Sequence, residues 1–411
     1  MNLARFIHRL ATDATFAARF QEAPDQLLST EQVALDDGAR SALLTVCRDH
    51  VQSTSLCNPA QTPPPFAWAP AKGSYNHPMQ ALWDSTTFED DYLRAMQAGL
   101  ERDPGTAAAT GARSALMELP SLCCEAAGGL RQRAQPVTTA WNLLYFALHM
   151  LDTLEDGDRP DASWFHWGIG AAINITTGLL ATSSRALDRL EQTGVSASVA
   201  QAIRHDFNRT LFTMCVGQHH DLTLQEPSLE QCWQIAEAKS GAFFALPCRA
   251  GARLAGANAQ TVRLFGNVGL HLGMLIQIGD DLSGLWSTDE AASDLVSGRQ
   301  SMLPIVYALH TASADDCQLL RSCLQQAVGN PEAEATARQL IINSGAVLYL
   351  MTEAQRHAEQ AQRLLASMSL PSAPRKALQA LLDRSNPARH KSYPHQEPTR
   401  VTGPASMIRT V

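Results

Sequence analysis

The helical pattern that runs from about residue 76 to residue 384 limits what this chain can fold into. Apolar residues, mostly Ala and Leu, recur at helical spacing in one segment after another, and Gly and Pro fall mostly between the segments. Alternating segments rich in β-branched residues, which would indicate strands, are absent. Apolar residues make up 45% of the 411 residues, so a sizeable core can be buried. The predicted fold class is all-α.

Two shorter regions flank this helical part. Residues 1–56 carry apolar residues at helical spacing, such as Leu3, Phe6, Ile7 and Leu10, and are predicted to form a small appended helical module. Residues 57–75 are rich in proline, which removes backbone donors and restrains its neighbours, so they are predicted to be a linker. Residues 385–411 are polar with little periodicity and are predicted to be a flexible tail.

Composition excludes several classes of protein. A net charge of −8 argues against a nucleic-acid partner, which would need a basic surface. No apolar run approaches the roughly 18 to 20 residues of a membrane span, and the start of the chain lacks the apolar block of a secretory signal. The nine cysteines include no Cys-x-x-Cys pair, which argues against a zinc site and favours reduced thiols. A cytoplasmic location is expected.

An acidic segment lies at the end of the apolar helix predicted from Trp141. In Leu151-Asp-Thr-Leu-Glu-Asp-Gly-Asp158, the residues Asp152, Glu155 and Asp156 are spaced i, i+3 and i+4, so their carboxylates share one helix face. Carboxylates this close repel one another unless a cation lies between them, and Mg²⁺ commonly bridges carboxylates to a diphosphate. The alternative is a solvated acidic end of a helix.

A second acidic segment, Gly273-Met-Leu-Ile-Gln-Ile-Gly-Asp-Asp-Leu-Ser-Gly284, is predicted to end another apolar helix at Asp280 and Asp281. Gln277 falls on the same side of that helix. Acids at the tip of a core helix are costly to desolvate without a partner, so two such helices favour a shared metal site over two coincidences. Lys239 and Arg299 are candidate cations for holding a diphosphate. A lysine that only extends to the surface is the alternative for Lys239.

These segments, in this order, resemble the polyprenyl diphosphate synthase family of class I isoprenoid synthases over about residues 95–384. The most specific part is Gln277-Ile-Gly-Asp-Asp followed by Ser293-Asp-Leu-Val-Ser-Gly-Arg-Gln-Ser-Met-Leu-Pro304. Gly217-Gln-His-His-Asp221 and Lys239-Ser240 are similar to two further motifs of the family. The resemblance implies an isoprenoid synthase domain at 76–384, built as a helical bundle around a deep apolar cavity. It also implies a homodimer.

The resemblance assigns roles to individual residues. It implies Mg²⁺, three ions per site, with the metal ligands Asp152, Glu155, Asp156, Asp280 and Asp281. It implies Lys239 as a catalytic cation alongside Asp152, Asp156 and Asp280. The implied substrate-binding residues, including those along the prenyl chain, are Arg113, Tyr145, Ala147, Leu148, Gln218, Lys239, Phe243, Gln277 and Arg299.

The sequence also departs from the family pattern. The first motif, Asp152-Thr-Leu-Glu-Asp156, is closer to the Asp-Thr-x-Glu-Asp of squalene synthases, and Gly284 stands in place of the last Asp of the second motif. The motif that holds the second diphosphate in the family, Gly-Gly-Lys-Arg-x-Arg-Pro, reads Thr110-Gly-Ala-Arg-Ser-Ala-Leu116. Only Arg113 remains there to bind that diphosphate. The loss of the other cationic partners is expected to weaken binding of the diphosphate severely.

An intact site for one diphosphate beside a depleted second site favours a terpene cyclase that ionises a single prenyl diphosphate, farnesyl or longer. The alternatives are a chain-elongating or head-to-head prenyltransferase and a non-catalytic subunit of a heteromeric synthase. Tyr145, Phe146, Phe243 and Phe244 could stabilise a carbocation or simply pack in the core. Ala147 and Leu148 precede the first motif without an aromatic ring, which favours long substrates.

Overall fold

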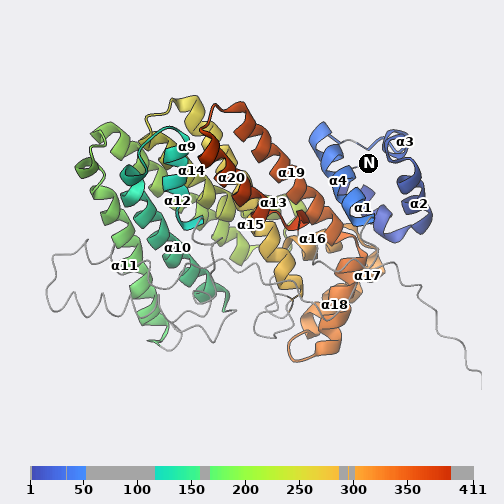
Figure 1. Cartoon of the computed structure of the whole chain (residues 1–411). Helices are drawn as coiled ribbons and strands as arrows, with labels where there is room; N and C mark the ends of the chain where they lie inside the picture. Colours follow the sequence, from blue (N-terminus) through green and yellow to red (C-terminus); the bar gives the residue numbers. More distant parts are fainter. Residues whose placement is uncertain are drawn as a thin grey trace, which may run out of the picture.

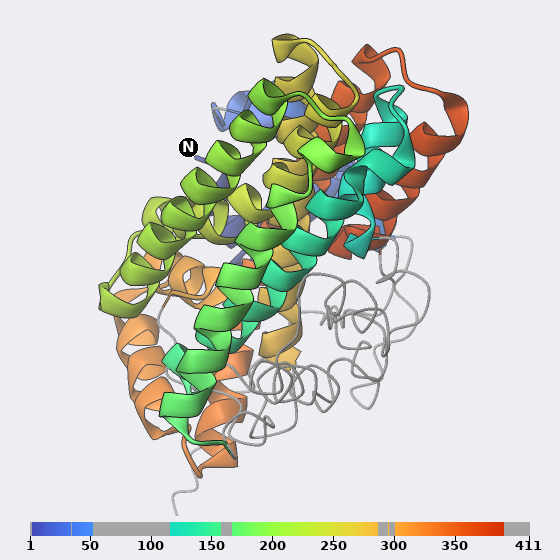
Figure 2. The same ribbon diagram turned by 90° about the vertical axis from the view of Figure 1, so that its left-hand side faces the viewer.

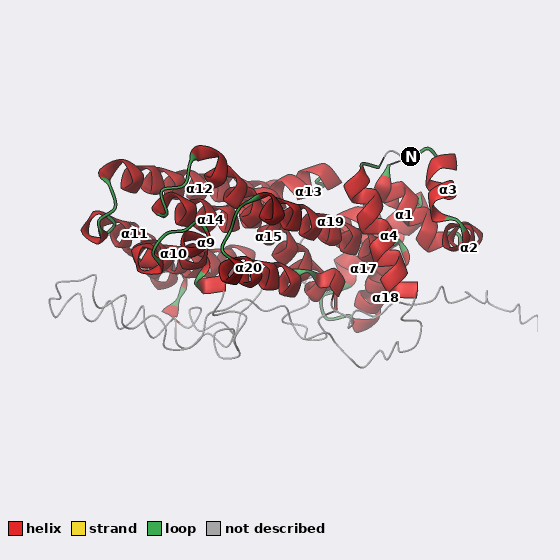
Figure 3. Ribbon diagram, turned by 45° about the horizontal axis from the view of Figure 1, so that its top comes forward, coloured by secondary structure: helices red, strands yellow, loops and turns green. Residues whose placement is uncertain are grey.

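In a computed structural model the chain is described at residues 2–33, 35–51, 116–157, 167–286, 295 and 301–389. Every regular element within these ranges is a helix, so the predicted all-α class is confirmed (Figure 3). None of the described helices is both long enough and apolar enough to cross a membrane. The predicted linker at 57–75, Arg113 and Arg299 lie outside the described residues.

The described helices succeed one another along the chain in the following order. They are α1 (Leu3–Thr12), α2 (Ala14–Glu22), α3 (Pro24–Thr30), α4 (Asp37–Val51), α9 (Leu119–Ala126), α10 (Gln135–Asp156), α11 (Ile169–Asp188), α12 (Ala197–Thr223), α13 (Leu229–Ala236), α14 (Ala242–Leu254), α15 (Ala259–Trp286), α16 (Leu303–Thr311), α17 (Ala314–Gln326), α18 (Pro331–Asn343), α19 (Ala346–Ser367) and α20 (Ser372–Ser385). A π-helical turn, Glu237–Gly241, joins α13 to α14, and short 3-10 turns lie at Arg131–Ala134, Glu191–Thr193 and Pro387–Arg389.

The long apolar helix α15 lies at the centre of the bundle. It packs against α14 on one side and α19 on another, while α10 packs against α11 (Figure 1). Close approach requires glycine at Gly269, because a Cβ there would overlap the backbone carbonyl of Phe244 on α14. The tight crossing of α14 and α15 fixes the position of the acidic segment near the end of α15.

The N-terminal helices are docked on the rest of the molecule through α16 and α19 (Figure 1). The Tyr307 hydroxyl on α16 donates a hydrogen bond of 2.8 Å to the carbonyl of Ala4, and His8 Nδ1 lies 2.9 Å from the carbonyl of Ser344. Phe6 and its aromatic neighbours belong to the same hydrophobic core as the central helices. The predicted boundary at residue 56 lies outside the described residues and stays a prediction.

The last described residues of the chain differ from the predicted tail. Ser385 ends α20, and Asn386 is fully buried and donates a hydrogen bond of 3.0 Å from Nδ2 to Gln355 Oε1 on α19. The prediction of a flexible segment is therefore wrong for residues 385–389, because a polar residue gains a buried partner far away in the sequence. Residues 390–411 lie outside the described part of the chain.

A partly buried histidine pair joins α15 to α19. His271 Nδ1 and His357 Nδ1 lie 2.8 Å apart, so one neutral ring donates a hydrogen bond to the other. Burial lowers the pKa of His271 to about 4 and that of His357 to about 3, and the positive charge of Arg356 lowers both further. The pair is therefore neutral in the folded protein at neutral pH.

We predict that this pair makes the fold sensitive to acid. Because the folded-state pKa values lie below the unfolded value of about 6.5, the stabilisation is complete above pH 6.5 and is lost as the pH falls towards 4. Replacing both rings (His271→Gln with His357→Gln) should reduce the loss of unfolding free energy between pH 6.5 and 4.5 by on the order of 3 kcal/mol. Denaturant unfolding at each pH measures this loss. The exposed His205→Gln is the control, and equal pH slopes for wild type and the double variant would contradict the prediction.

Candidate active site

The first acidic segment forms the last turns of α10. The helix ends at Asp156, and Gly157 closes it in the left-handed conformation with φ 65°. This conformation suits glycine because it has no Cβ. Asp152 and Asp156 are partly buried and Glu155 is exposed. The helix end therefore lies where the sequence places it, with the three acids at i, i+3 and i+4 on one face.

Lys239 lies at the centre of the candidate site. Its Nζ is 3.1 Å from Asp152 Oδ1 on α10 and 2.5 Å from Asp221 Oδ2 on α12. Only 19% of the side chain is exposed, so Lys239 is not an extended surface lysine. Burial alone would lower the pKa of Lys239, but the carboxylates of Asp152 and Asp221 outweigh it and raise the pKa, so the ammonium group is charged.

The backbone that presents Lys239 is a π-helical turn, Glu237–Gly241. Such turns insert one residue into a helix and occur frequently at functional sites. On the neighbouring helix α12, Gly217 allows the close contact, because a Cβ there would lie 2.9 Å from Ala238 Cβ and 3.1 Å from Lys239 Cγ. The glycine that begins the Gly-Gln-x-x-Asp motif thus lets α12 approach this turn.

Asp221 is a site residue that the sequence-based list of ligands omits. It accepts hydrogen bonds from Lys239 Nζ and, on its other oxygen, from the hydroxyl of Ser301. Its signal in the sequence is its place at the last position of the motif Gly217-Gln-His-His-Asp221. The resemblance alone assigns no role to this aspartate. Asp221 connects the lysine to the segment that leads into α16.

Gln218, next to that glycine, has a buried amide. Neither its Oε1 nor its Nε2 makes a hydrogen bond of normal geometry within the described part of the chain. The amide nevertheless lies close enough to Glu155 to lower the pKa of that carboxyl, against burial and the charge of Asp152, which together raise it. Buried amides are rarely left without partners, so Gln218 is suited to a polar ligand.

The second acidic segment does not end its helix, contrary to the prediction, because α15 continues to Trp286. Its two acids face different surroundings. Asp280 is exposed, whereas Asp281 is 7% exposed. Adjacent helical residues point about 100° apart, so only one of the two can face the core.

Asp281 is held in a buried chain of hydrogen bonds. Its Oδ1 accepts from Gln277 Nε2 at 2.8 Å and its Oδ2 accepts from the backbone N–H of Leu303 at 3.0 Å. Gln277 Oε1 in turn accepts from the hydroxyl of Ser240 at 2.5 Å. Burial raises the pKa of Asp281 to about 6, although the hydrogen bonds from Gln277 and Leu303 oppose the rise. Asp281 thus ties the start of α16 to α15, and Gln277 ties α15 to the turn that carries Lys239.

Aromatic residues fill the space between α10 and α14. The rings of Trp141 and Phe243 stack with centroids 5.0 Å apart, and Trp141 Nε1 donates a hydrogen bond of 3.3 Å to the carbonyl of Phe243. Phe244 is also buried against Trp141. Tyr145 is only partly buried, one turn after Trp141. These contacts favour core packing for the Phe243 ring, and its role toward a substrate stays a prediction.

Ala147 and Leu148, whose small or aliphatic side chains predict a long substrate, lie in the same helix. Ala147 is fully buried and Leu148 is partly buried on α10. Both precede the first acidic turn, as predicted, and their effect on substrate length is not decided by their burial.

The described side chains of the site form no closed set of metal ligands. Among the described side chains, no three carboxylates, imidazoles or thiols are gathered closely enough to enclose a metal ion. Mg²⁺ commonly binds one or two carboxylates and completes its shell with water and substrate phosphates. The half-buried Asp152 and Asp156 and the exposed Asp280 fit such an open site, whereas Asp281 is already committed to Gln277 and Leu303.

Comparison with known proteins identifies a family and several relatives that match more than half of the chain. Residues 112–343 match the sequence profile described as polyprenyl synthetase. The chain is 30% identical to geranylgeranyl diphosphate synthase of Mycobacterium tuberculosis over 223 residues, which cover 51% of this chain and 62% of that enzyme. It is 28% identical to (2E,6E)-farnesyl diphosphate synthase of the same organism over 281 residues, which cover 63% of this chain and 75% of that enzyme. The match to the first relative spans less than two thirds of its length.

Solved structures share the fold. A polyprenyl synthetase from Streptomyces coelicolor superposes with a TM-score of 0.63 at 23% identity, covering 75% of this chain and 95% of that one. A geranylgeranyl pyrophosphate synthase from Corynebacterium glutamicum, complexed with isoprenyl diphosphate and magnesium, gives a TM-score of 0.61 at 18% identity, covering 86% and 99%. The predicted isoprenoid synthase type of helical bundle is confirmed.

We predict that Asp281 stabilises the fold, whereas its neighbour Asp280 contributes little to stability. Asp281→Ala should leave the N–H of Leu303 without its acceptor and lower the free energy of unfolding by about 1–3 kcal/mol. Asp280→Ala, at an exposed position, should change it by less than about 0.5 kcal/mol. Amide hydrogen exchange at Leu303 and denaturant unfolding, both without Mg²⁺, measure the difference.

The exchange measurement makes the comparison specific. Leu303 should exchange faster in Asp281→Ala and at the wild-type rate in Asp280→Ala. Equal protection of Leu303 in both variants would show that Asp281 does not anchor α16.

Proposed function

Because the chain belongs to the polyprenyl synthetase family, we propose that it is a magnesium-dependent prenyltransferase that lengthens an allylic prenyl diphosphate. The observation that carries this proposal is the charged Lys239 held between Asp152 of the first acidic segment and Asp221. The relatives described above are prenyl diphosphate synthases, which favours chain elongation over the cyclase that the motifs alone predict.

The charged groups suit the departure of a diphosphate. The ammonium of Lys239 would hold diphosphate oxygens, and the amide of Gln218 would gain the partner it lacks. Asp152, Asp156 and Asp280 would hold Mg²⁺, three ions in all, with Glu155 at the edge of the cluster. When bound, Mg²⁺ would neutralise the charge that develops on the diphosphate as the carbon–oxygen bond breaks. Asp281 would support this arrangement through Leu303 instead of binding metal.

The prenyl chain is proposed to run along α10 towards α14. Tyr145 and Leu148 lie on α10 before the acidic turn, Phe243 lies on α14, and no aromatic ring occupies position 147 or 148. A substrate of farnesyl length or longer suits this lining. The deep apolar cavity of the family is part of this proposal, and residues 76–115 of the predicted domain lie outside the described residues.

A second candidate function rests on the acceptor motif. Ala112 and Ala115 replace a lysine and an arginine of the pattern that holds the second diphosphate, and Arg113 remains. A terpene cyclase that ionises one prenyl diphosphate needs no second site. A non-catalytic subunit is disfavoured, because the chain keeps Asp152, Asp156 and Asp280.

We predict that the purified protein with Mg²⁺ converts labelled farnesyl or geranylgeranyl diphosphate into longer prenyl diphosphates only when isopentenyl diphosphate is added. The reason is that the lysine and acids are placed to release one diphosphate, while elongation needs an acceptor. Chromatography of the labelled products, with and without isopentenyl diphosphate, measures it. Hydrocarbon or alcohol formed from one substrate alone would establish the cyclase instead.

Two variants test the metal site in the same assay. Asp152→Ala and Asp280→Ala should each lower turnover by at least about 100-fold, the scale typical of lost electrostatic stabilisation. The exposed Glu332→Ala on α18 is a control of equal charge change. Full activity of both aspartate variants would remove these residues from the metal site.

Pairing as a homodimer is proposed through the outer faces of α11 and α12, which lie side by side (Figure 2). Large apolar residues stand exposed there at i and i+4: Ile169 and Ile173 on α11, and Phe212 and Val216 on α12. Phe212 is 70% exposed. Exposed apolar patches of this kind often mark protein contacts.

We predict that Phe212→Glu weakens the dimer at least about tenfold, since a charge would be buried in an apolar contact. Sedimentation velocity across a concentration series measures the dissociation constant. Val328→Glu, at a position that is 71% exposed between α17 and α18, should leave it unchanged. A monomeric wild type would contradict the proposed pairing.

A cytoplasmic location belongs to the same proposal. The eight cysteines within the described ranges are all free thiols, and most of them are buried. Unpaired cysteines are typical of proteins kept in a reducing compartment.

A further inference from the structure

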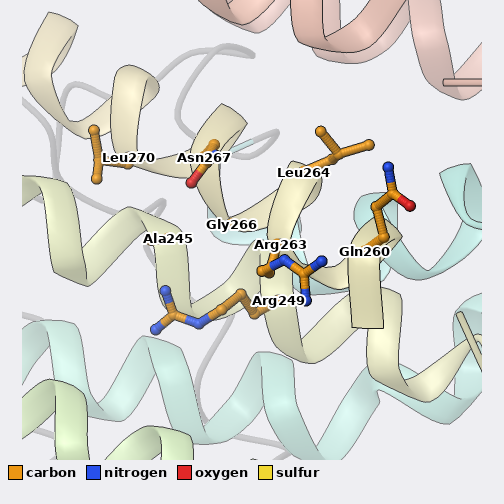
Figure 4. A pocket seen from close by; sticks show the side chains of 8 residues that line it. All are labelled: Ala245, Arg249, Gln260, Arg263, Leu264, Gly266, Asn267 and Leu270. Atoms are coloured by element: carbon orange, nitrogen blue, oxygen red, sulfur yellow. The ribbon is translucent and has the colours of Figure 1, made fainter. Parts of the chain in front are cut away.

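A pocket of about 430 Å³, with both polar and apolar walls, opens at the crossing between α14 and α15 (Figure 4). Arg249 of α14 and Arg263 of α15 are the charged residues in its wall, and Gln260 and Asn267 add amide groups. Leu264 and Leu270 supply an apolar part. The wall therefore combines two guanidinium groups and two amides with no carboxylate.

Arg249 is held in position by its neighbours. Its aliphatic stem packs over Gly266, where a Cβ would lie only 2.8 Å from Arg249 Cγ. The guanidinium donates one hydrogen bond of 3.2 Å to the hydroxyl of Thr210 on α12. A partly buried guanidinium with five N–H donors and one neutral partner can accept further oxygen ligands.

Negative charge around this arginine is already committed. Asp206 on α12 is a carboxylate whose charge acts on Arg249, and it pairs with Arg253 at 2.8 Å. Burial lowers the pKa of Arg249, and the positive charges of Arg253 and Arg209 act in the same direction, against Asp206. Arginines thus outnumber acids at this place, although the whole chain carries a net charge of −8.

Arg263 adds to the excess from the first turns of α15. It is exposed, and no ion pair joins it to another described residue. The helix begins at Ala259, and Asn258 caps it by accepting from the N–H of Thr261 at 2.9 Å. The positive end of the helix dipole therefore lies near Gln260 and Arg263 in the pocket wall.

The pocket is separate from the candidate active site and still connected to it. Arg263 precedes Asp280 by 17 residues on α15, a separation of about 26 Å along the helix axis. Leu270, also in the pocket wall, packs on Gly241, where a Cβ would lie 3.5 Å from Leu270 Cγ. Gly241 ends the π-helical turn that carries Lys239.

We propose that this pocket binds a small phosphorylated molecule through Arg249 and Arg263. Guanidinium groups pair with phosphate oxygens through two parallel hydrogen bonds, and the amides of Gln260 and Asn267 can complete the set of donors. Leu264 and Leu270 would contact the apolar part of the ligand. A recessed pocket, as opposed to a flat basic surface, favours a small molecule over the headgroups of a membrane.

Inorganic phosphate is the first probe, titrated calorimetrically without Mg²⁺ into the Lys239→Gln protein, in which the active-site cation is removed. That protein should retain phosphate binding. Adding Arg249→Gln with Arg263→Gln should weaken it at least about tenfold. The matched control, Arg5→Gln with Arg19→Gln, removes two exposed arginines of α1 and α2 and should have no effect. Thermal unfolding confirms that each variant is folded.

Three outcomes would overturn the proposal. They are the absence of phosphate binding in Lys239→Gln, equal binding after loss of Arg249 and Arg263, and equal weakening by the control pair. Cosedimentation with phosphatidylcholine vesicles, with and without phosphatidylglycerol, distinguishes the source of the phosphate. Vesicle binding that depends on Arg249 and Arg263, without binding of free phosphate, would assign the pocket to a lipid surface and reject the small molecule.

Discussion

The ion pairs of Lys239 with Asp152 and Asp221 organise the candidate active site. They join the last turns of α10 and of α12 to the π-helical turn before α14, and Asp152 precedes Lys239 by 87 residues in the sequence. A buried ammonium is costly without partners, so the two carboxylates both hold the lysine and keep it charged. A negatively charged ligand such as a substrate diphosphate would compete with Asp152 and Asp221 for this ammonium group.

A second set of contacts connects this centre to distant parts of the molecule. Asp281 binds the first N–H of α16, and Tyr307 on the same helix binds the carbonyl of Ala4. The N-terminal helices therefore contact α16, the helix that begins beside Asp281. Through these bonds, a region outside the matched family segment supports the position of α16.

Helix α15 also links two sites of opposite charge. Its C-terminal part carries Asp280, and its first turns carry Arg263 at the basic pocket, with Leu270 and Gly241 connecting that pocket to the turn of Lys239. Like-charged groups are gathered at each end and each end is suited to a ligand of the other sign.

Helical spacing in the sequence predicts the all-α class, the place of the first acidic segment at the end of α10, and the shared face of Asp152, Glu155 and Asp156, because each depends only on residues that are close in the sequence. The motifs also led to Lys239. Only the tertiary structure decided that Asp281 turns into the core while Asp280 stays exposed, that Asp221 is the second partner of Lys239, and that Asn386 is buried and not part of a tail. Each of these depends on contact between segments distant in the sequence, which no local pattern encodes.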